Sequence, residues 1–168
     1  MVQEYTSKNT SINKNKVPKL FTLIENNFGW REGTTNLDIG GGKYDTATEY
    51  LNKFGVQNFI YDKYNRSKDH NTIVEIATRH EKPDTVTISN VLNVIKEKKI
   101  RGQVINLART RVKKGGLIFI SVYNSGREGE SKKDCWQNAM TIDDYLEEVQ
   151  AVFPNAFKKY GIIVATRD

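Results

Sequence analysis

With 168 residues, the chain has the length of one domain that can bury most of the surface its unfolded form exposes. It is 38% hydrophobic and 27% charged, and no apolar run approaches the ~20 residues of a membrane span. This excludes an integral membrane protein and predicts a soluble globular domain. The net charge of +6 makes a polyanionic partner such as nucleic acid plausible, and it also fits a protein kept soluble by its charge.

The N-terminal sequence and the single cysteine both indicate the cellular compartment. The N-terminus, M-V-Q-E-Y-T-S-K-N-T, lacks the apolar h-region of a signal peptide. The single cysteine, Cys135, has no intramolecular partner and no evident base, so it is interpreted as an ordinary thiol. We therefore expect a cytoplasmic protein. Residues 1–14 are polar and aperiodic and are predicted to form a flexible arm, with one domain over residues 15–168.

The first ordered elements surround a run of three glycines. Apolar residues share one helical face from Val17 to Phe28, and Gly29 can end that helix. Residues 36–45, N-L-D-I-G-G-G-K-Y-D, then predict a strand, a tight turn and a helix start. Glycine tolerates positive φ and has no Cβ, so the backbone of this turn can lie directly against a ligand.

A second strand and an acid follow at a regular spacing. Ala47, Tyr50, Leu51 and Phe54 form a helical stripe that Gly55 can end. The next apolar run, residues 59–61, ends on Asp62, twenty residues after Gly42. In nucleotide-binding folds an acid at this place accepts hydrogen bonds from both ribose hydroxyls.

The pattern Asp38-x-Gly40-x-Gly42 resembles the first motif of class I S-adenosylmethionine-dependent methyltransferases. Asp38 favours this cofactor over NAD, because its carboxylate can meet the amino group of the methionine moiety, whereas a dinucleotide would bring a pyrophosphate there. The glycines alone would also fit a tight surface loop. The resemblance implies a set of cofactor-binding residues: Asp38, Ile39, Gly40, Gly41, Gly42, Tyr44, Asp62, Lys63, Asn71, Ser89 and Asn90.

Residues 63–71, K-Y-N-R-S-K-D-H-N, show no apolar alternation and are predicted to form a loop at the ligand-binding edge of the sheet. Tyr64 is expected near the methyl acceptor, and Arg66 is expected to contact the substrate. The third strand of the family fold is not visible before Pro83, so it is expected to be reduced or absent. The resemblance then implies that Asp69 or Asn71 could contact the adenine. The only two histidines are too few to predict a metal site.

Residues 85–88 form a typical central strand and lead into S-N-V-L-N-V. In the methyltransferase resemblance Ser89 and Asn90 occupy the fourth motif, whose residues flank the methyl group and the nucleophile. The two prolines and the aromatic residue of conventional base N-methyltransferases are missing, which argues against that class. No residue in the sequence is a convincing general base.

The next helix and strand give an independent match. A helical stripe runs from Ile100 to Val112, and K-K-G-G at residues 113–116 introduces an apolar strand over 117–123, as in the family's fifth strand. Eight Lys or Arg residues face one acid between Lys96 and Lys114. This cluster fits either a nucleic-acid surface or a solvated helix face.

Residues 124–140 lack periodicity and are predicted to be a loop over the acceptor pocket. Trp136 and Gln137 would offer a stacking surface and an amide to the substrate, although a flexible surface loop with a buried tryptophan fits equally well. A capping box at Thr141 then starts a helix, and residues 156–160 and 162–166 predict a hairpin across Gly161.

Residues 17–168 as a whole resemble small methyltransferases often encoded by phages and mobile elements. The predicted fold is α/β: a Rossmann-like class I methyltransferase sandwich with a mostly parallel sheet, a C-terminal antiparallel hairpin and helices on both faces. The predicted activity is methyl transfer from S-adenosylmethionine to a nucleic acid or nucleotide, with Ser89, Asn90 and Tyr64 beside the acceptor. The alternatives are a small-molecule or protein acceptor, or a non-catalytic factor that binds the cofactor or a host protein.

Overall fold

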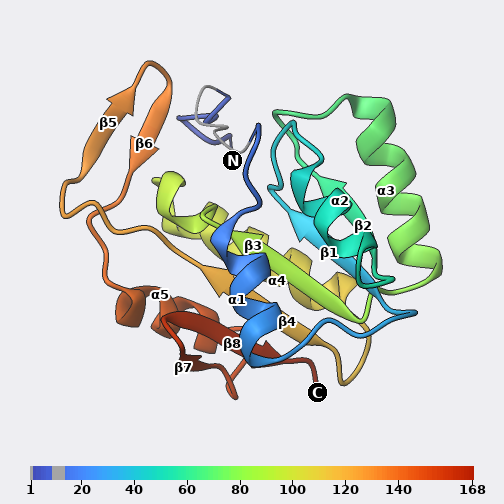
Figure 1. The fold of residues 1–168 in the computed structure, drawn as a ribbon. Coiled ribbons are helices and arrows are strands. Elements are labelled where there is room, and N and C mark those ends of the chain that lie inside the picture. Colours follow the sequence, from blue (N-terminus) through green and yellow to red (C-terminus); the bar gives the residue numbers. More distant parts are fainter. Residues whose placement is uncertain (1, 9–13) are drawn as a thin grey trace.

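The structure, a computed structural model, describes residues 2–8 and 14–168. Its centre is a six-stranded sheet of order β2-β1-β3-β4-β8-β7, with helices on both faces (Figure 1). The strands of the sheet are β1 (Thr35–Ile39), β2 (Gln57–Tyr61), β3 (Thr85–Ser89), β4 (Leu117–Ser121), β7 (Phe157–Lys159) and β8 (Ile162–Thr166). The helices are α1 (Lys19–Asn27), α2 (Thr46–Asn52), α3 (Lys68–His80), the 3-10 helix η1 (Leu92–Val94), α4 (Lys98–Arg111) and α5 (Ile142–Gln150).

The pairing of the strands confirms the predicted fold class. β2, β1, β3 and β4 are parallel, whereas β8 runs antiparallel to β4 and β7 runs antiparallel to β8. The predicted hairpin of residues 156–160 and 162–166 is present as β7 and β8, and Gly161 adopts φ 75° at its turn. The sheet is therefore mostly parallel with an antiparallel edge.

The handedness of the β-α-β crossovers decides which face of the sheet each helix covers. The chain passes from β1 through α2 to β2, and then crosses back over β1 through α3 to β3. Right-handed crossovers in opposite directions place their helices on opposite faces. Residues of α1 and α2 accordingly share one core cluster, and residues of α3, α4 and α5 share the other. Figure 1 shows α1 in front of the sheet and α4 behind it.

Two features of the sheet topology bear on the site. The chain between β2 and β3 contains no strand among its described residues, so the strand missing from the sequence pattern is also missing from the fold. The strand order reverses between β1 and β3, and open α/β sheets bind ligands at the carboxyl ends of strands beside such a switch point.

Two predicted loops contain regular structure. Helix α3 begins at Lys68, inside the loop expected over residues 63–71, because the Ser67 hydroxyl accepts a hydrogen bond from the His70 N–H and caps it. The segment 124–140 contains the hairpin of β5 (Gly129–Lys132) and β6 (Cys135–Gln137). Strand β5 is largely exposed and β6 has only three residues, so neither has an apolar pattern to read.

Helices α1 and α5 start where the sequence indicates. Pro18 precedes α1, and the Thr141 hydroxyl and the Asp144 carboxylate form the predicted capping box of α5. Trp30 stacks on Phe21 and packs against the core cluster that contains residues of α1 and α2. No helix in the described residues is long and apolar enough to cross a membrane.

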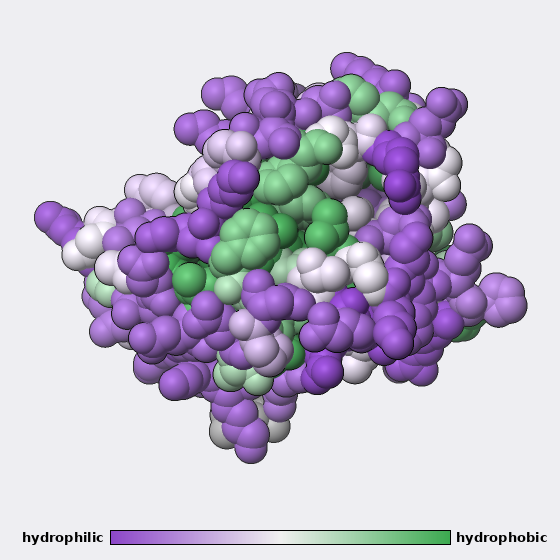
Figure 2. Space-filling model, turned by 90° about the horizontal axis from the view of Figure 1, so that it is seen from below, coloured by the Kyte–Doolittle hydropathy of each residue, from purple (hydrophilic) through white to green (hydrophobic). Residues whose placement is uncertain are grey.

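The face seen from below has an apolar area bordered by polar side chains (Figure 2). Phe28 is one of the exposed large hydrophobic residues, and its ring packs against Phe119 and Tyr160.

Candidate functional site

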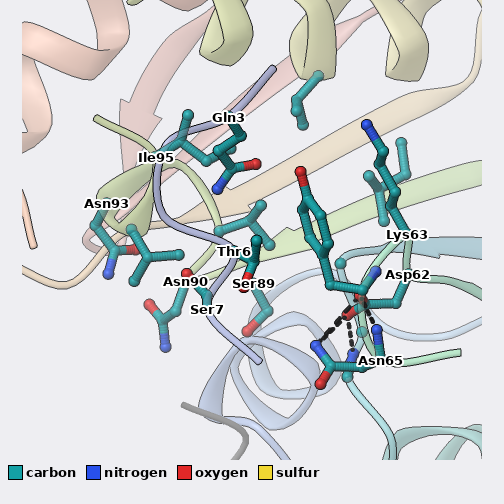
Figure 3. A pocket seen from close by; sticks show the side chains of 18 of the residues that line it. Gln3, Thr6, Ser7, Asp62, Lys63, Asn65, Ser89, Asn90, Asn93 and Ile95 are labelled. Carbon is teal, nitrogen blue, oxygen red and sulfur yellow. Dashed lines mark hydrogen bonds between the residues drawn. The ribbon is translucent and has the colours of Figure 1, made fainter. Parts of the chain in front are cut away.

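A cavity of about 590 Å³ lies at the carboxyl ends of β1, β2 and β3. One side, here the glycine-turn side, is formed by residues 38–42, 62–65 and 89–91. The other, here the arm side, is formed by Gln3, Thr6, Ser7, Asn93, Val94, Ile95, Tyr123 and Gln137. Figure 3 shows Asp62, Lys63 and Asn65 across the pocket from Asn93 and Ile95, with Gln3, Thr6 and Ser7 between them.

The glycine turn after β1 is packed so closely that it excludes side chains. Gly40 and Gly42 adopt φ 74° and 78°, which only glycine adopts without strain. A Cβ on Gly40 would lie 2.5 Å from Val91 Cγ2, and one on Gly41 would lie 2.4 Å from Asp38 Oδ2. The turn therefore presents bare backbone to the cavity while it rests on Asp38 and Val91.

Asp38 is a buried carboxylate at the base of this turn. It is 1% exposed, and the Thr87 hydroxyl donates to its Oδ1 at 3.0 Å. Burial raises the pKa of Asp38 to about 7, against the opposing effect of the Thr87 hydrogen bond; Asp62 raises it further and Arg66 lowers it. No ion pair reaches Asp38 within the described residues, so a cation entering the cavity would be a favourable partner.

Asp62 binds the glycine turn to the loop that follows β2. Its Oδ2 accepts from the Gly42 N–H at 2.9 Å, and its Oδ1 accepts from the N–H groups of Tyr64 at 3.0 Å and Asn65 at 2.9 Å. Asn71 holds the backbone on both sides, accepting from the Asp62 N–H and donating to the Asp62 carbonyl. Asn71 and Asp69 do not line the cavity, so neither contacts an adenine from where it stands.

Arg66 and Tyr44 also stand outside the cavity lining. The Arg66 guanidinium donates to the carbonyls of Gly42 at 2.7 Å and Tyr44 at 3.0 Å, and it pairs with Asp45 at 2.8 Å. These contacts connect the far end of the glycine turn to the loop after β2. Arg66 therefore fixes the shape of the turn in this structure, where the sequence had suggested a substrate contact.

Ser89 and Asn90 reach the cavity from the end of β3. Asn90 adopts φ 54°, a left-handed conformation that is costly for residues other than glycine, asparagine and aspartate. Its N–H donates to the Ser121 carbonyl at 3.0 Å, which holds the bend in place. An exposed polar side chain on a strained backbone at the end of a central strand is a frequent feature of functional sites.

Of the two substrate residues predicted in the hairpin, Gln137 lines the cavity and Trp136 does not. Trp136 packs instead against Tyr5 of the N-terminal segment, with ring centroids 5.2 Å apart, and Lys96 Nζ lies 4.8 Å from its ring centroid. Lys96 also pairs with Glu4 at 2.7 Å. Residues 2–8 are thus held over the pocket by the hairpin and by Lys96.

Sequence reasoning missed the lining residues Gln3, Thr6 and Ser7, because nothing in a polar, aperiodic segment indicates where it packs. It also passed over Asn93, which stands in the S-N-V-L-N-V run already assigned to the cleft. An asparagine that recurs three residues after Asn90 at the end of a predicted central strand was the available signal.

Half of the basic cluster takes part in internal ion pairs. Four of its eight cations pair with acids within the chain: Lys96 with Glu4, Arg101 with Glu148, Arg111 with Glu75 and Lys113 with Asp84. Arg101 is 5% exposed. Arg101 and Arg111 are buried, whereas Lys96 and Lys113 stay partly exposed, so the basic surface is smaller than the sequence suggested.

No protein-family model matches this sequence, and no curated protein matches it. Solved structures do resemble it. A Burkholderia thailandensis 1,6-didemethyltoxoflavin-N1-methyltransferase with bound S-adenosylhomocysteine superimposes with a TM-score of 0.64 at 15% identity, over 89% of this chain and 77% of that one. A T. Thermophilus 16S rRNA methyltransferase in complex with AdoMet and guanosine gives 0.57 at 16% identity, over 92% of this chain and 44% of that one.

The sugar N-methyltransferase KedS8 from Streptoalloteichus gives a TM-score of 0.56 at 9% identity, over 89% of this chain and 85% of that one. At these identities the likeness shows the fold. The chain has the Rossmann-like fold of class I methyltransferases, as its sequence predicted.

Proposed function

We propose that the chain binds S-adenosylmethionine on the glycine-turn side of its cavity and transfers the methyl group to an acceptor on the arm side. The observation that carries this proposal is the buried, unpaired carboxylate of Asp38 beneath a side-chain-free turn that Asp62 holds in place. A carboxylate that lacks a cation and a turn of bare backbone suit a ligand with an ammonium group and a large flat body.

Different residues are proposed to bind different parts of S-adenosylmethionine. Asp38 would pair with the amino group of the methionine moiety, and the backbone of Gly40 and Gly42 would lie along the ligand. Asp62 already accepts three backbone N–H groups and the side-chain amide of Asn65, so it would release present bonds to accept the ribose hydroxyls. Val104 and Leu107 of α4 line the cavity and provide an apolar surface for the adenine.

S-adenosylmethionine supplies an activated methyl group on a positively charged sulfur. For transfer, the chain has to hold a nucleophile in line at about 3 Å and exclude water. Ser89, Asn90 and Tyr64, which line the cavity, are the groups proposed to orient it. The Asn90 side-chain carbonyl can accept an N–H from an amine, which keeps the lone pair of a neutral amine free to attack.

The class of molecule that accepts the methyl group is a separate part of the proposal. Nucleic acid, protein and small molecule are all compatible with a class I fold, since the structural relatives named above include enzymes for RNA, a sugar and a small heterocycle. A non-catalytic factor that binds the cofactor or a host protein is the second candidate function, favoured because the sequence offers no convincing general base. The likeness to enzymes of phages and mobile elements stays a prediction.

Two measurements test the proposal. Calorimetric titration with S-adenosylmethionine and S-adenosylhomocysteine should show one site per chain, and the absence of heat would leave only a scaffold role. Incubation with methyl-labelled cofactor and separate DNA, RNA, protein and small-molecule fractions of a cell extract should then transfer label to one of them. Binding without transfer to any fraction would favour the non-catalytic alternative.

A further inference from the structure

The arm side of the cavity contains a hydrogen-bond acceptor that has no partner. Asn93 is 3% exposed and lines the cavity beside Ile95 (Figure 3). Its Nδ2 donates to Gln137 Oε1 at 3.2 Å, and its Oδ1 has no hydrogen-bond partner among the described residues. Buried polar atoms are nearly always hydrogen-bonded, and this exception belongs to a residue that lines the cavity, so a ligand bound there could supply the missing donor.

The orientation of both amides follows from backbone carbonyls. Gln137 Nε2 donates to the carbonyls of Tyr123 and Asn138, each at 3.0 Å, and carbonyls can only accept. Gln137 Oε1 must therefore face Asn93, and the Asn93 amide nitrogen must face Gln137. The atom of Asn93 that is left for a ligand is an oxygen, so the ligand has to bring an N–H or O–H group.

Charge is nearly absent from this side. The charged residues of the whole lining are Asp38, Asp62 and Lys63 on the glycine-turn side, together with Lys132 on the exposed strand β5. Val94, Ile95 and Ile100 provide apolar wall. A phosphate or carboxylate on the arm side would lose its water shell without gaining a buried cation, which is unfavourable.

The volume also limits what fits. The cavity of about 590 Å³ has to hold both the proposed cofactor and the acceptor, and residues 3–7 cross it (Figure 3). Pockets of 300–1,000 Å³ typically enclose one drug-sized ligand. The space beside a bound cofactor therefore suits a compact molecule.

Resting on the proposed function, we infer that the methyl acceptor is a small, uncharged, largely apolar molecule with an N–H or O–H donor that binds Asn93 Oδ1. Asn93 and the paired Gln137 select the donor, and the apolar wall selects an uncharged body. A nucleic-acid acceptor, which carries phosphates, is disfavoured by the same features.

The test uses indole and 1-methylindole, two uncharged apolar probes that differ in the N–H donor. The protein is first saturated with S-adenosylhomocysteine, and each probe is titrated by ligand-observed NMR, with AMP as the charged comparison. We expect indole to bind about fivefold more tightly than 1-methylindole, the usual effect of one hydrogen bond to a buried group, and AMP to bind more weakly than either.

In the variant Asn93→Leu the preference for indole should disappear while S-adenosylhomocysteine still binds. The matched control Gln103→Leu, at an exposed lining residue of α4, should keep the preference. Equal binding of the two indoles by the wild-type protein, no binding of indole, or a preference for AMP would each overturn the inference. The comparison within the wild type holds even if Asn93→Leu does not fold.

Loss of S-adenosylhomocysteine binding by the wild-type protein would instead refute the proposed function itself. Methyl label found in DNA, RNA or protein would leave the proposed function standing and overturn the inference about the acceptor.

Discussion

The N–H of Gly42 donates to Asp62 Oδ2 at 2.9 Å, across twenty residues of sequence. This hydrogen bond joins the glycine turn after β1 to the acid at the end of β2, on adjacent parallel strands. The other oxygen of the carboxylate accepts from the backbone of Tyr64 and Asn65. Both oxygens of Asp62 thus face N–H donors, and one side chain fixes the spacing of the two loops that form the glycine-turn side.

The variant Asp62→Asn tests this relationship. In either orientation of the new amide, its NH₂ group faces a backbone N–H, so at least one buried donor loses its acceptor. We expect the free energy of unfolding to fall by about 1–3 kcal/mol and affinity for S-adenosylhomocysteine to fall at least tenfold. Denaturant unfolding and calorimetry measure the two effects.

Asp69→Asn is the matched control, because Asp69 is an exposed acid in the first turn of α3. It should change the free energy of unfolding by less than about 1 kcal/mol, the usual size of a helix-dipole effect, and leave affinity unchanged. Equal effects of the two variants would mean that Asp62 does not organise the turn.

Asp38 leads to a pH prediction with a definite sign. Burial raises the pKa of Asp38 from an ordinary value of 3.8 to about 7 in the folded chain. The folded state then holds a proton that the unfolded state releases, so this group stabilises the fold below pH 4, and the contribution is lost as pH rises to 7. Asp38→Asn should remove this loss. The free energy of unfolding of the variant minus that of the wild type should therefore be larger at pH 8 than at pH 4.5, by roughly 2–4 kcal/mol.

The same variant should bind S-adenosylhomocysteine poorly, since an amide cannot pair with an ammonium group. In the wild type, affinity should increase as pH rises through 7, where the carboxylate ionises. Urea unfolding at pH 4.5 and 8 and calorimetry across the same range measure both. A wild-type affinity that does not change with pH, or full affinity in Asp38→Asn, would exclude Asp38 from ligand binding.

Local sequence was sufficient to predict the glycine turn, its flanking strands and the two acids, because each depends on neighbours within a few residues or on the regular spacing of a strand–helix–strand unit. Local sequence could not predict the role of Arg66. A long cation in a polar loop gives no sign that its partners are the carbonyls of Gly42 and Tyr44, more than twenty residues earlier. The position of residues 2–8 depends on contacts such as Glu4 with Lys96, which no local pattern encodes.

Asn90 combines two properties that substitution can separate. Its backbone at φ 54° costs an alanine about 1–2 kcal/mol and costs glycine little, while both variants lose the side-chain amide. We expect Asn90→Ala to lower the free energy of unfolding by about 1 kcal/mol and Asn90→Gly to leave it nearly unchanged. Both should lower methyl transfer at least tenfold without weakening S-adenosylhomocysteine binding by the same factor.

Unfolding curves and methyl-transfer rates for the pair separate strain from chemistry. If Asn90→Gly transferred methyl groups at the wild-type rate, the side chain would have no part in the reaction, and the bend alone would explain the asparagine.

Trp136 controls how firmly residues 2–8 cover the pocket. Its ring lies against Tyr5 and under Lys96, and the Ser7 N–H donates to the Asp134 carbonyl at 3.3 Å in the same hairpin. Aromatic pairs contribute about 0.5–1.5 kcal/mol beyond their area, and the exposed Lys96–Glu4 pair is screened by solvent and adds little. Trp136→Ala should therefore release the segment and leave the domain folded, whereas Trp136→Phe, which keeps a ring, should release it less.

Hydrogen exchange at the Ser7 amide and the dissociation rate of S-adenosylhomocysteine report this release. Both should rise severalfold in Trp136→Ala and by a smaller factor in Trp136→Phe. The segment lies over the pocket, so faster exchange at Ser7 together with an unchanged dissociation rate would mean that the ligand leaves by a route that residues 2–8 do not obstruct. Unchanged exchange would show that Tyr5 and Lys96 hold the segment without the tryptophan.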